Sequence, residues 1–171
     1  MNISTKLITP QYIKDTTVVQ QLVADINLDS FIYQTQDFFL RPTLGTDLYN
    51  NLINEVVLNS GSTTGLTSST YQTLLDYSQP YLAYMVVYEA FPYLSIKIAN
   101  NGLIRRTGQG DFEPISLDEL KYFRQDVFNK ANSMKTLLEQ FLNDNKSTYY
   151  TTEIKDDCDN NIRKTLGGIY F

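Results

Sequence analysis

Apolar residues recur at helical spacing in two neighbouring segments near the start of the chain. They predict one amphipathic helix in residues 28–40 and a second in residues 47–58. Between them, in "RPTLGTDLYNNL", Pro42 is expected to end the first helix, Gly45 to turn the chain and Thr46 to cap the second helix. Because the connection is short, the two helices are expected to pack together. The positions expected to face the core are Leu28, Phe31, Ile32, Thr35, Phe38 and Phe39, then Leu48, Leu52, Ile53, Val56 and Val57.

Residues 70–91 form the most apolar stretch of the chain. Aromatic and leucine side chains follow at alternating intervals of three and four residues, which predicts a seam along one helix. This seam consists of Leu74, Tyr77, Tyr81, Tyr84, Tyr88 and Phe91. Small and branched residues occupy the opposite side, so we expect a helix in the middle of a bundle, with the seam either in the core or at a subunit interface. Pro80 is expected near a helix start or at a kink, and Pro92 at an end.

Residues 94–107 predict a β-hairpin. Apolar and polar residues alternate on both sides of Asn101-Gly102, a dipeptide that favours a tight hairpin turn. Lys97, Arg105 and Arg106 make this segment basic. Two interpretations remain open: a contact with an acidic partner surface or with DNA in a channel, or a solvated strand edge protected by its charge.

A long helix and a tail complete the chain. Ser116 and Glu119 form a capping box, and a near-heptad pattern broken only by Arg124 predicts a helix to about residue 143, roughly 40 Å long at about 1.5 Å per residue. Its apolar positions are Leu117, Leu120, Val127, Ala131, Met134, Leu138 and Phe141. The tail is polar and then apolar again, and it is expected to dock on another subunit, to dock on its own core or to remain frayed. Its candidate contact residues are Ile162, Leu166, Ile169, Tyr170 and Phe171.

Composition narrows the possible functions. The 171 residues suit one domain, and the net charge of −5 argues against broad nucleic-acid binding, which needs clustered Lys and Arg. The single cysteine allows no intrachain disulfide, which is typical of a reducing compartment. We expect no signal peptide and no transmembrane helix. The 13 tyrosines are typical of protein interfaces, although an AT-rich genome would also enrich them.

The chain offers little catalytic chemistry. It has no histidine, which removes the commonest general base and zinc ligand. Asp157, Asp159 and Asn161 resemble the start of a calcium loop, but Ile162 stands where glycine is needed and Gly168 where a bidentate glutamate is needed. We therefore predict no catalytic residue, no cofactor and no metal site.

Four segments together resemble a known family. They are "LGTDLYNNL" at 44–52, "QPYLAYMVVYEAFPYLSIKIANNGLI" at 79–104, the long helix after residue 116 and the terminal "GGIYF". In this order they resemble the head–tail connector (adaptor, or head-completion) proteins of tailed bacteriophages, most closely those of Bacteroides-infecting, crAss-like phages. The resemblance rests on fold motifs and includes no catalytic fingerprint.

The resemblance implies a virion structural protein that works at the head–tail interface after assembly in the host cytoplasm. It implies a ring, expected to be dodecameric, that sits below the portal protein, extends the DNA channel and docks the next tail-side connector or tail protein. DNA would pass through the lumen without sequence-specific binding. The alternative is a monomeric or dimeric helical protein-binding module in the host cytoplasm, outside the virus particle.

The expected fold is mainly α. It is a small helical bundle with a long C-terminal helix and one β-hairpin inserted between helices. Residues 1–143 would form the helical connector domain, with the hairpin at 94–107, and residues 144–171 an extended C-terminal arm.

Overall fold

The protein is mainly helical. The computed structural model describes residues 5–17, 19, 25–99, 102–105 and 117–150. Along the chain the helices are α1 (Pro10–Thr16), α2 (Ile26–Thr35), the π-helix η1 (Gln36–Leu40), α3 (Arg41–Leu44), α4 (Thr46–Leu58), α5 (Ser69–Ser95), α6 (Leu117–Asp144) and α7 (Lys146–Tyr149). The strands β1 (Ile96–Ala99) and β2 (Gly102–Arg105) lie between α5 and α6 in sequence.

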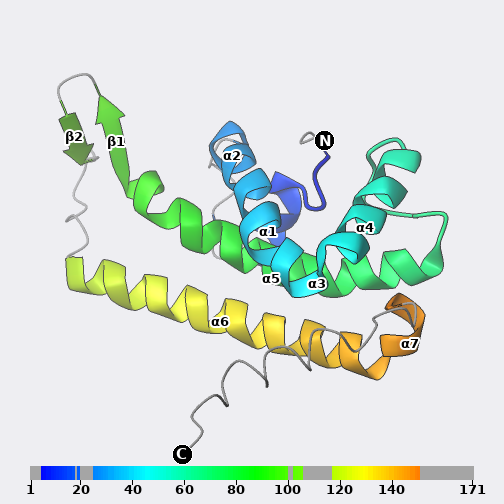
Figure 1. Ribbon diagram of the computed structural model, residues 1–171. Helices are drawn as coiled ribbons and strands as arrows, with labels where there is room; N and C mark the ends of the chain where they lie inside the picture. Colours follow the sequence, from blue (N-terminus) through cyan, green and yellow to red (C-terminus); the bar gives the residue numbers. More distant parts are fainter. Residues whose placement is uncertain (1–4, 18, 20–24, 100–101, 106–116, 151–171) are drawn as a thin grey trace, which may run out of the picture.

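Helix α5 is the centre of the fold. Helix α6 runs along one side of it, while α1, α2, η1 and α4 pack against its other side (Figure 1). Because α5 is covered from two sides, it must be apolar nearly all round, as its sequence predicts. Side chains on both of its faces are fully buried: Leu74, Leu75, Leu82, Ala83, Val86 and Ala90.

Both prolines of α5 lie inside the helix, so the prediction that Pro92 ends it was wrong. Each proline removes one backbone hydrogen bond, which costs stability in an isolated helix. Here, burial of the residues around Pro80 between the two layers offsets that cost. The helix continues past Pro92 to Ser95.

The predicted aromatic seam contacts α6. The ring of Tyr77 stacks on that of Phe141, with centroids 4.1 Å apart, and the ring of Tyr88 packs against that of Phe128 at 5.1 Å. Arg124, the one residue that breaks the near-heptad pattern of α6, lays its guanidinium 4.2 Å from the centroid of the Tyr88 ring. A planar cation stacks well on an aromatic face, so Arg124 fits the seam without being apolar.

The segment from α2 to α3 differs from the prediction. Pro42 does not end the first helix, because the chain stays helical through η1 and α3 as far as Leu44. A π-helix accommodates one extra residue in a turn, so it shifts which side chains face the core. Leu40 is therefore fully buried, whereas Phe38, expected in the core, is 70% exposed.

The corner between α3 and α4 depends on Gly45. Its φ of 80° and ψ of 154° lie in a region that is essentially restricted to glycine. Its N–H donates to the Arg41 carbonyl at 3.0 Å, and its own carbonyl accepts from Tyr49 N–H at 3.1 Å. Gly45 is thus the N-cap of α4; Thr46 is already helical, and the expectation that Thr46 caps the helix was wrong.

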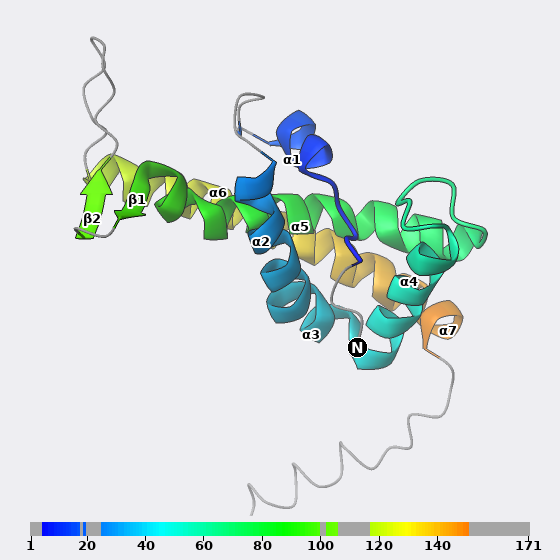
Figure 2. The same cartoon turned by 90° about the horizontal axis from the view of Figure 1, so that it is seen from above.

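Strands β1 and β2 pair antiparallel at one end of α5 and α6 (Figure 2). Lys97 is opposite Ile104, and Ile98 is opposite Leu103. Both strands fall within the range 94–107 predicted as a hairpin. Residues 100–101 and 106–107 lie outside the described residues.

The C-terminal arm was predicted to begin at residue 144, which is too early in the chain. Residues 146–149 are helical, not extended, and the tyrosines at the end of this turn bind the body. The Tyr149 hydroxyl donates to the Thr70 carbonyl at 3.0 Å, and the Tyr150 hydroxyl donates to the Leu44 carbonyl at 3.2 Å. The helical body therefore extends to residue 150. Residues 151–171 lie outside the described part of the chain.

Within the part of the chain that the structure describes, no helix is both long and apolar enough to cross a lipid bilayer.

Candidate functional site

The residues predicted as contact sites are only partly described. Lys97 lies in the middle of β1 and Arg105 at the end of β2, opposite Ile96. The structure therefore brings these two basic positions onto one small sheet. Arg106 and the tail residues Ile162, Leu166, Ile169, Tyr170 and Phe171 lie outside the described residues.

Exposed aromatic side chains gather near the same end of the molecule. Tyr122 and Phe123 lie on the second turn of α6, and their ring centroids are 6.0 Å apart. Tyr122 is 72% exposed and Phe123 about half exposed. Tyr93, near the end of α5, is also more than half exposed, and its ring packs against Phe31 at 5.4 Å. We call Tyr122 and Phe123, whose rings contact each other, the distal patch.

The sequence contains a signal for the distal patch outside the apolar stripe of α6. Tyr122 and Phe123 fall between the apolar positions of α6 that face α5. Two adjacent aromatics off the buried stripe must point at least partly to solvent. Exposed aromatics of this kind are typical of protein interfaces, because they combine apolar area with few rotatable bonds.

A second apolar surface lies at the opposite end. Leu58, the last residue of α4, is largely exposed, and Val57 is about half exposed. Val57 was predicted to face the core; instead Tyr49 is buried together with Leu48, Leu52 and Val56. Helix α4 and the β1–β2 pair lie at opposite ends of the molecule in both views (Figures 1 and 2). We call Val57 and Leu58 the α4 patch.

An open groove of about 280 Å³ lies between the η1–α3 segment and α6. Phe38, Phe39, Pro42, Thr43, Tyr81, Lys135 and Glu139 line it. Lys135 and Glu139 form an ion pair at 3.3 Å within α6. Burial raises the pKa of the Tyr81 phenol, the Thr43 side chain lowers it by hydrogen bonding, and the Glu139 carboxylate raises it.

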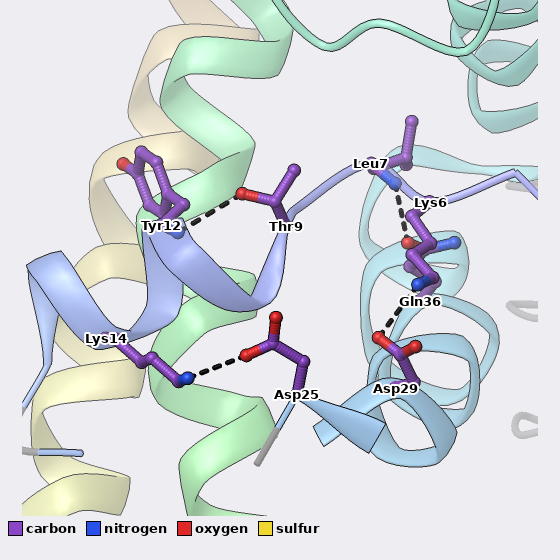
Figure 3. A network of polar contacts seen from close by, with 8 residues as sticks. All are labelled: Lys6, Leu7, Thr9, Tyr12, Lys14, Asp25, Asp29 and Gln36. Carbon is purple, nitrogen blue, oxygen red and sulfur yellow. Dashed lines mark hydrogen bonds and ion pairs between the residues drawn. The ribbon is translucent and has the colours of Figure 1, made fainter. Parts of the chain in front are cut away.

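The N-terminal residues Thr5–Ile8, which we call the strap, are held by two buried glutamines. Leu7 N–H donates to Gln36 Oε1 at 2.7 Å (Figure 3). Gln36 Nε2 also donates to the Thr5 carbonyl at 3.1 Å. From α5, Gln79 Nε2 donates to the Leu7 carbonyl at 3.0 Å. The strap thus connects η1 and α5. No sequence pattern predicts it, because its partners lie far away along the chain.

The comparison with protein families gives a match over residues 40–162, to DUF6712, a family of unknown function. This range is more than half of the chain. The chain belongs to the DUF6712 family. No curated protein and no solved structure matches it.

The DUF6712 range begins at the last residue of η1. It therefore includes the Gly45 corner, both apolar patches and the whole α5–α6 pair. The strap, α1 and α2 precede it. One wall of the strap site, Gln79 on α5, is thus inside the family range, while the other, Gln36, lies four residues before it.

Among the residues of this DUF6712 protein that the structure describes, no three His, Cys, Asp or Glu side chains are close enough together to hold a metal ion.

Alkaline pH should destabilise this DUF6712 protein. Burial raises the pKa of Tyr12, Tyr49, Tyr81, Tyr149 and Tyr150 above the ordinary value of 10.0. The folded state therefore favours the neutral phenols. Their contribution to stability is fully present below the pKa of tyrosine in the unfolded chain, and it is lost as the pH rises through the raised pKa values of the folded state. The free energy of unfolding in urea, measured between pH 8 and pH 11, should decrease above about pH 10.

Substitution of Tyr81 by phenylalanine tests the cause of this pH dependence. The variant lacks one of the buried phenols, so its stability should fall less steeply above about pH 10 than that of the unmodified protein. An identical slope for the two proteins would contradict the role of Tyr81.

Proposed function

We propose that this protein is a structural subunit of a ring at the head–tail interface of a tailed phage virion. The observation that carries the proposal is the presence of two different exposed apolar surfaces, the distal patch and the α4 patch, at opposite ends of the subunit. A ring is built by head-to-tail contacts, in which two unlike surfaces of neighbouring subunits meet. A subunit with one such surface at each end can make these head-to-tail contacts with two neighbours.

The position of the paired strands supports the same proposal. Strands β1 and β2 lie at the end of the α5–α6 pair, near the distal patch. A two-stranded ribbon is marginal in isolation, so it gains from packing on a neighbour. We therefore propose that the β1–β2 hairpin, with Lys97 and Arg105, contributes to a contact between subunits or with the portal protein.

The order of the sequence motifs supports the choice of a connector over other ring proteins. The segments that resemble phage connectors include the Gly45 corner and the α5–α6 pair, which form the central part of this fold. In the proposed ring, expected to be dodecameric, the portal protein lies on one face and a tail-side protein on the other. DNA passes through the lumen without sequence-specific binding, as suits a subunit with a net charge of −5.

Light scattering on the purified protein, alone and mixed with the portal protein from the same phage genome, tests this function. We expect a large complex of fixed stoichiometry when the portal is present. A protein that remains monomeric or dimeric, and that does not bind portal or tail proteins, would favour the alternative of a helical binding module in the host cytoplasm.

The distal patch gives a specific test. Tyr122→Asp should weaken association by about 2 kcal/mol, or roughly thirtyfold, because it places a charge at an aromatic contact. Its free energy of unfolding should change by no more than about 0.5 kcal/mol, since Tyr122 is 72% exposed. Both effects can be measured by light scattering over a concentration series and by urea unfolding.

Asn132→Asp is the matched control. Asn132 is also exposed on α6 and gains the same charge, but it is not part of the distal patch. We expect this variant to associate as the unmodified protein does. Equal weakening in both variants would indicate a general effect of charge and would contradict a specific role for Tyr122.

A further inference from the structure

The strap site recognises main-chain atoms. Gln36 and Gln79 are both buried, and their amide groups bind the Leu7 N–H, the Leu7 carbonyl and the Thr5 carbonyl. Leu7 and Ile8 supply the apolar anchors, and both are fully buried. This combination of backbone hydrogen bonds and a few buried side chains is the way in which proteins bind extended peptides.

Charge complementarity extends the site along residues 5–17. Lys6 Nζ lies 2.8 Å from Asp29 Oδ1, and Lys14 Nζ lies 2.6 Å from Asp25 Oδ1 (Figure 3). Both carboxylates belong to the start of α2, where negative charge is also favoured by the helix dipole. The two lysines of this segment therefore lie against an acidic helix start.

The connection from this segment to the body runs from Thr17 to Asp25. Lys14 and Asp25 are in direct contact, yet eight residues lead from Thr17 to Asp25. An extended chain advances about 3.3–3.6 Å per residue, so eight residues reach roughly 26–29 Å. A connection with this reach would let the segment occupy the same site on a subunit packed directly beside its own.

We propose that residues 5–17 are exchanged between copies: the segment of one subunit occupies the site formed by α2, η1 and α5 of its neighbour. The exchanged segment makes the same contacts in a neighbour as in its own subunit, so the exchange costs little free energy. In an assembly the neighbouring site is held at high effective concentration. The inference rests on the proposed function in that the ring supplies the adjacent copies; a dimer would supply them as well.

The Lys6–Asp29 ion pair reports directly on this exchange. A carbodiimide activates the Asp29 carboxylate, and the Lys6 amine then displaces the activated group to form an amide bond without a spacer. The Lys14→Arg variant keeps the positive charge at Lys14 but removes its reactive amine, so that the Lys14–Asp25 pair does not compete. Heavy-isotope-labelled and unlabelled full-length Lys14→Arg protein are unfolded and refolded together in equal amounts, mixed with the portal protein and cross-linked.

Mass spectrometry of the cross-linked Lys6–Asp29 peptides gives the answer. Exchange predicts that about half of them join a labelled to an unlabelled peptide. An additional Asp29→Asn substitution removes the carboxylate, so the cross-linked peptide should disappear and thereby confirm its assignment.

Light scattering on the same sample separates this inference from the proposed function. A ring whose cross-linked peptides carry only one label overturns the exchange and leaves the ring intact. Mixed-label peptides in a dimer that forms no ring support the exchange and overturn the ring. A monomer with single-label peptides overturns both.

Discussion

Replacement of Leu138 by alanine should lower the free energy of unfolding by about 3 kcal/mol. Leu138 is fully buried on the face of α6 that packs against α5. Truncation of a buried leucine removes apolar burial and leaves a cavity, and together these cost about 2–5 kcal/mol. The α5–α6 contact is the most extensive between two helices of the described fold, so neighbouring side chains have little freedom to fill the space. Urea unfolding followed by circular dichroism measures the change.

The adjacent residue provides the control. Leu137 has the same side chain and lies on the same helix, but it is 51% exposed. Leu137→Ala loses much less burial, and we expect a change of less than about 1 kcal/mol. Equal losses in the two variants would mean that α6 does not pack on α5 through the face described above.

Replacement of Gly45 by alanine should cost about 1–3 kcal/mol of folding stability. Apart from the two adjacent residues, a Cβ atom at this position would meet no other atom within 4 Å, so the cost does not come from crowding. It comes from the backbone, because φ of 80° with ψ of 154° is unfavourable for every residue with a side chain. The midpoint of urea unfolding should fall with little change in the slope.

Two further substitutions establish that the backbone is the cause. Gly45→Asn should be as harmful as Gly45→Ala, since asparagine tolerates the left-handed helical region but not a ψ of 154°. Thr46→Ala changes the exposed residue next to the corner, which has no capping bond, and should shift stability by about 0.5 kcal/mol at most. An alanine at position 45 that left stability unchanged would refute the described corner.

Apolar spacing predicted the helices well where the burial of one helix face determines the structure. The long helix after residue 116, the second helix of the corner and the aromatic seam of α5 all follow from apolar spacing, which burial enforces. The course through Pro42 could not be predicted in this way. It depends on η1, which places Leu40 in the core and Gln36 against the strap. The hydrogen bond between Leu7 and Gln36 joins residues 29 positions apart in the sequence, so a local pattern does not reveal it.

The candidate site was predictable only in part. The exposed pair Tyr122–Phe123 departs visibly from the buried stripe of α6, so its exposure follows from helical geometry alone. The strap could not be predicted from the sequence. Gln36 and Gln79 are ordinary polar residues in the sequence, and only the fold buries them beside backbone groups that need hydrogen-bond partners. Lys97 and Arg105 fall on the paired strands β1 and β2, whose position a local turn signal indicated. Their role as contact residues stays a prediction.

The π-helix has a consequence for how this chain can change in length. One residue of an α-helix turns the chain by about 100°, so a single deletion within residues 36–40 that restored a regular α-helix would rotate the Gly45 corner by that angle relative to α2. Helix α4 would then leave in a different direction and lose its place against α5. Single-residue deletions should therefore be absent from viable variants at η1.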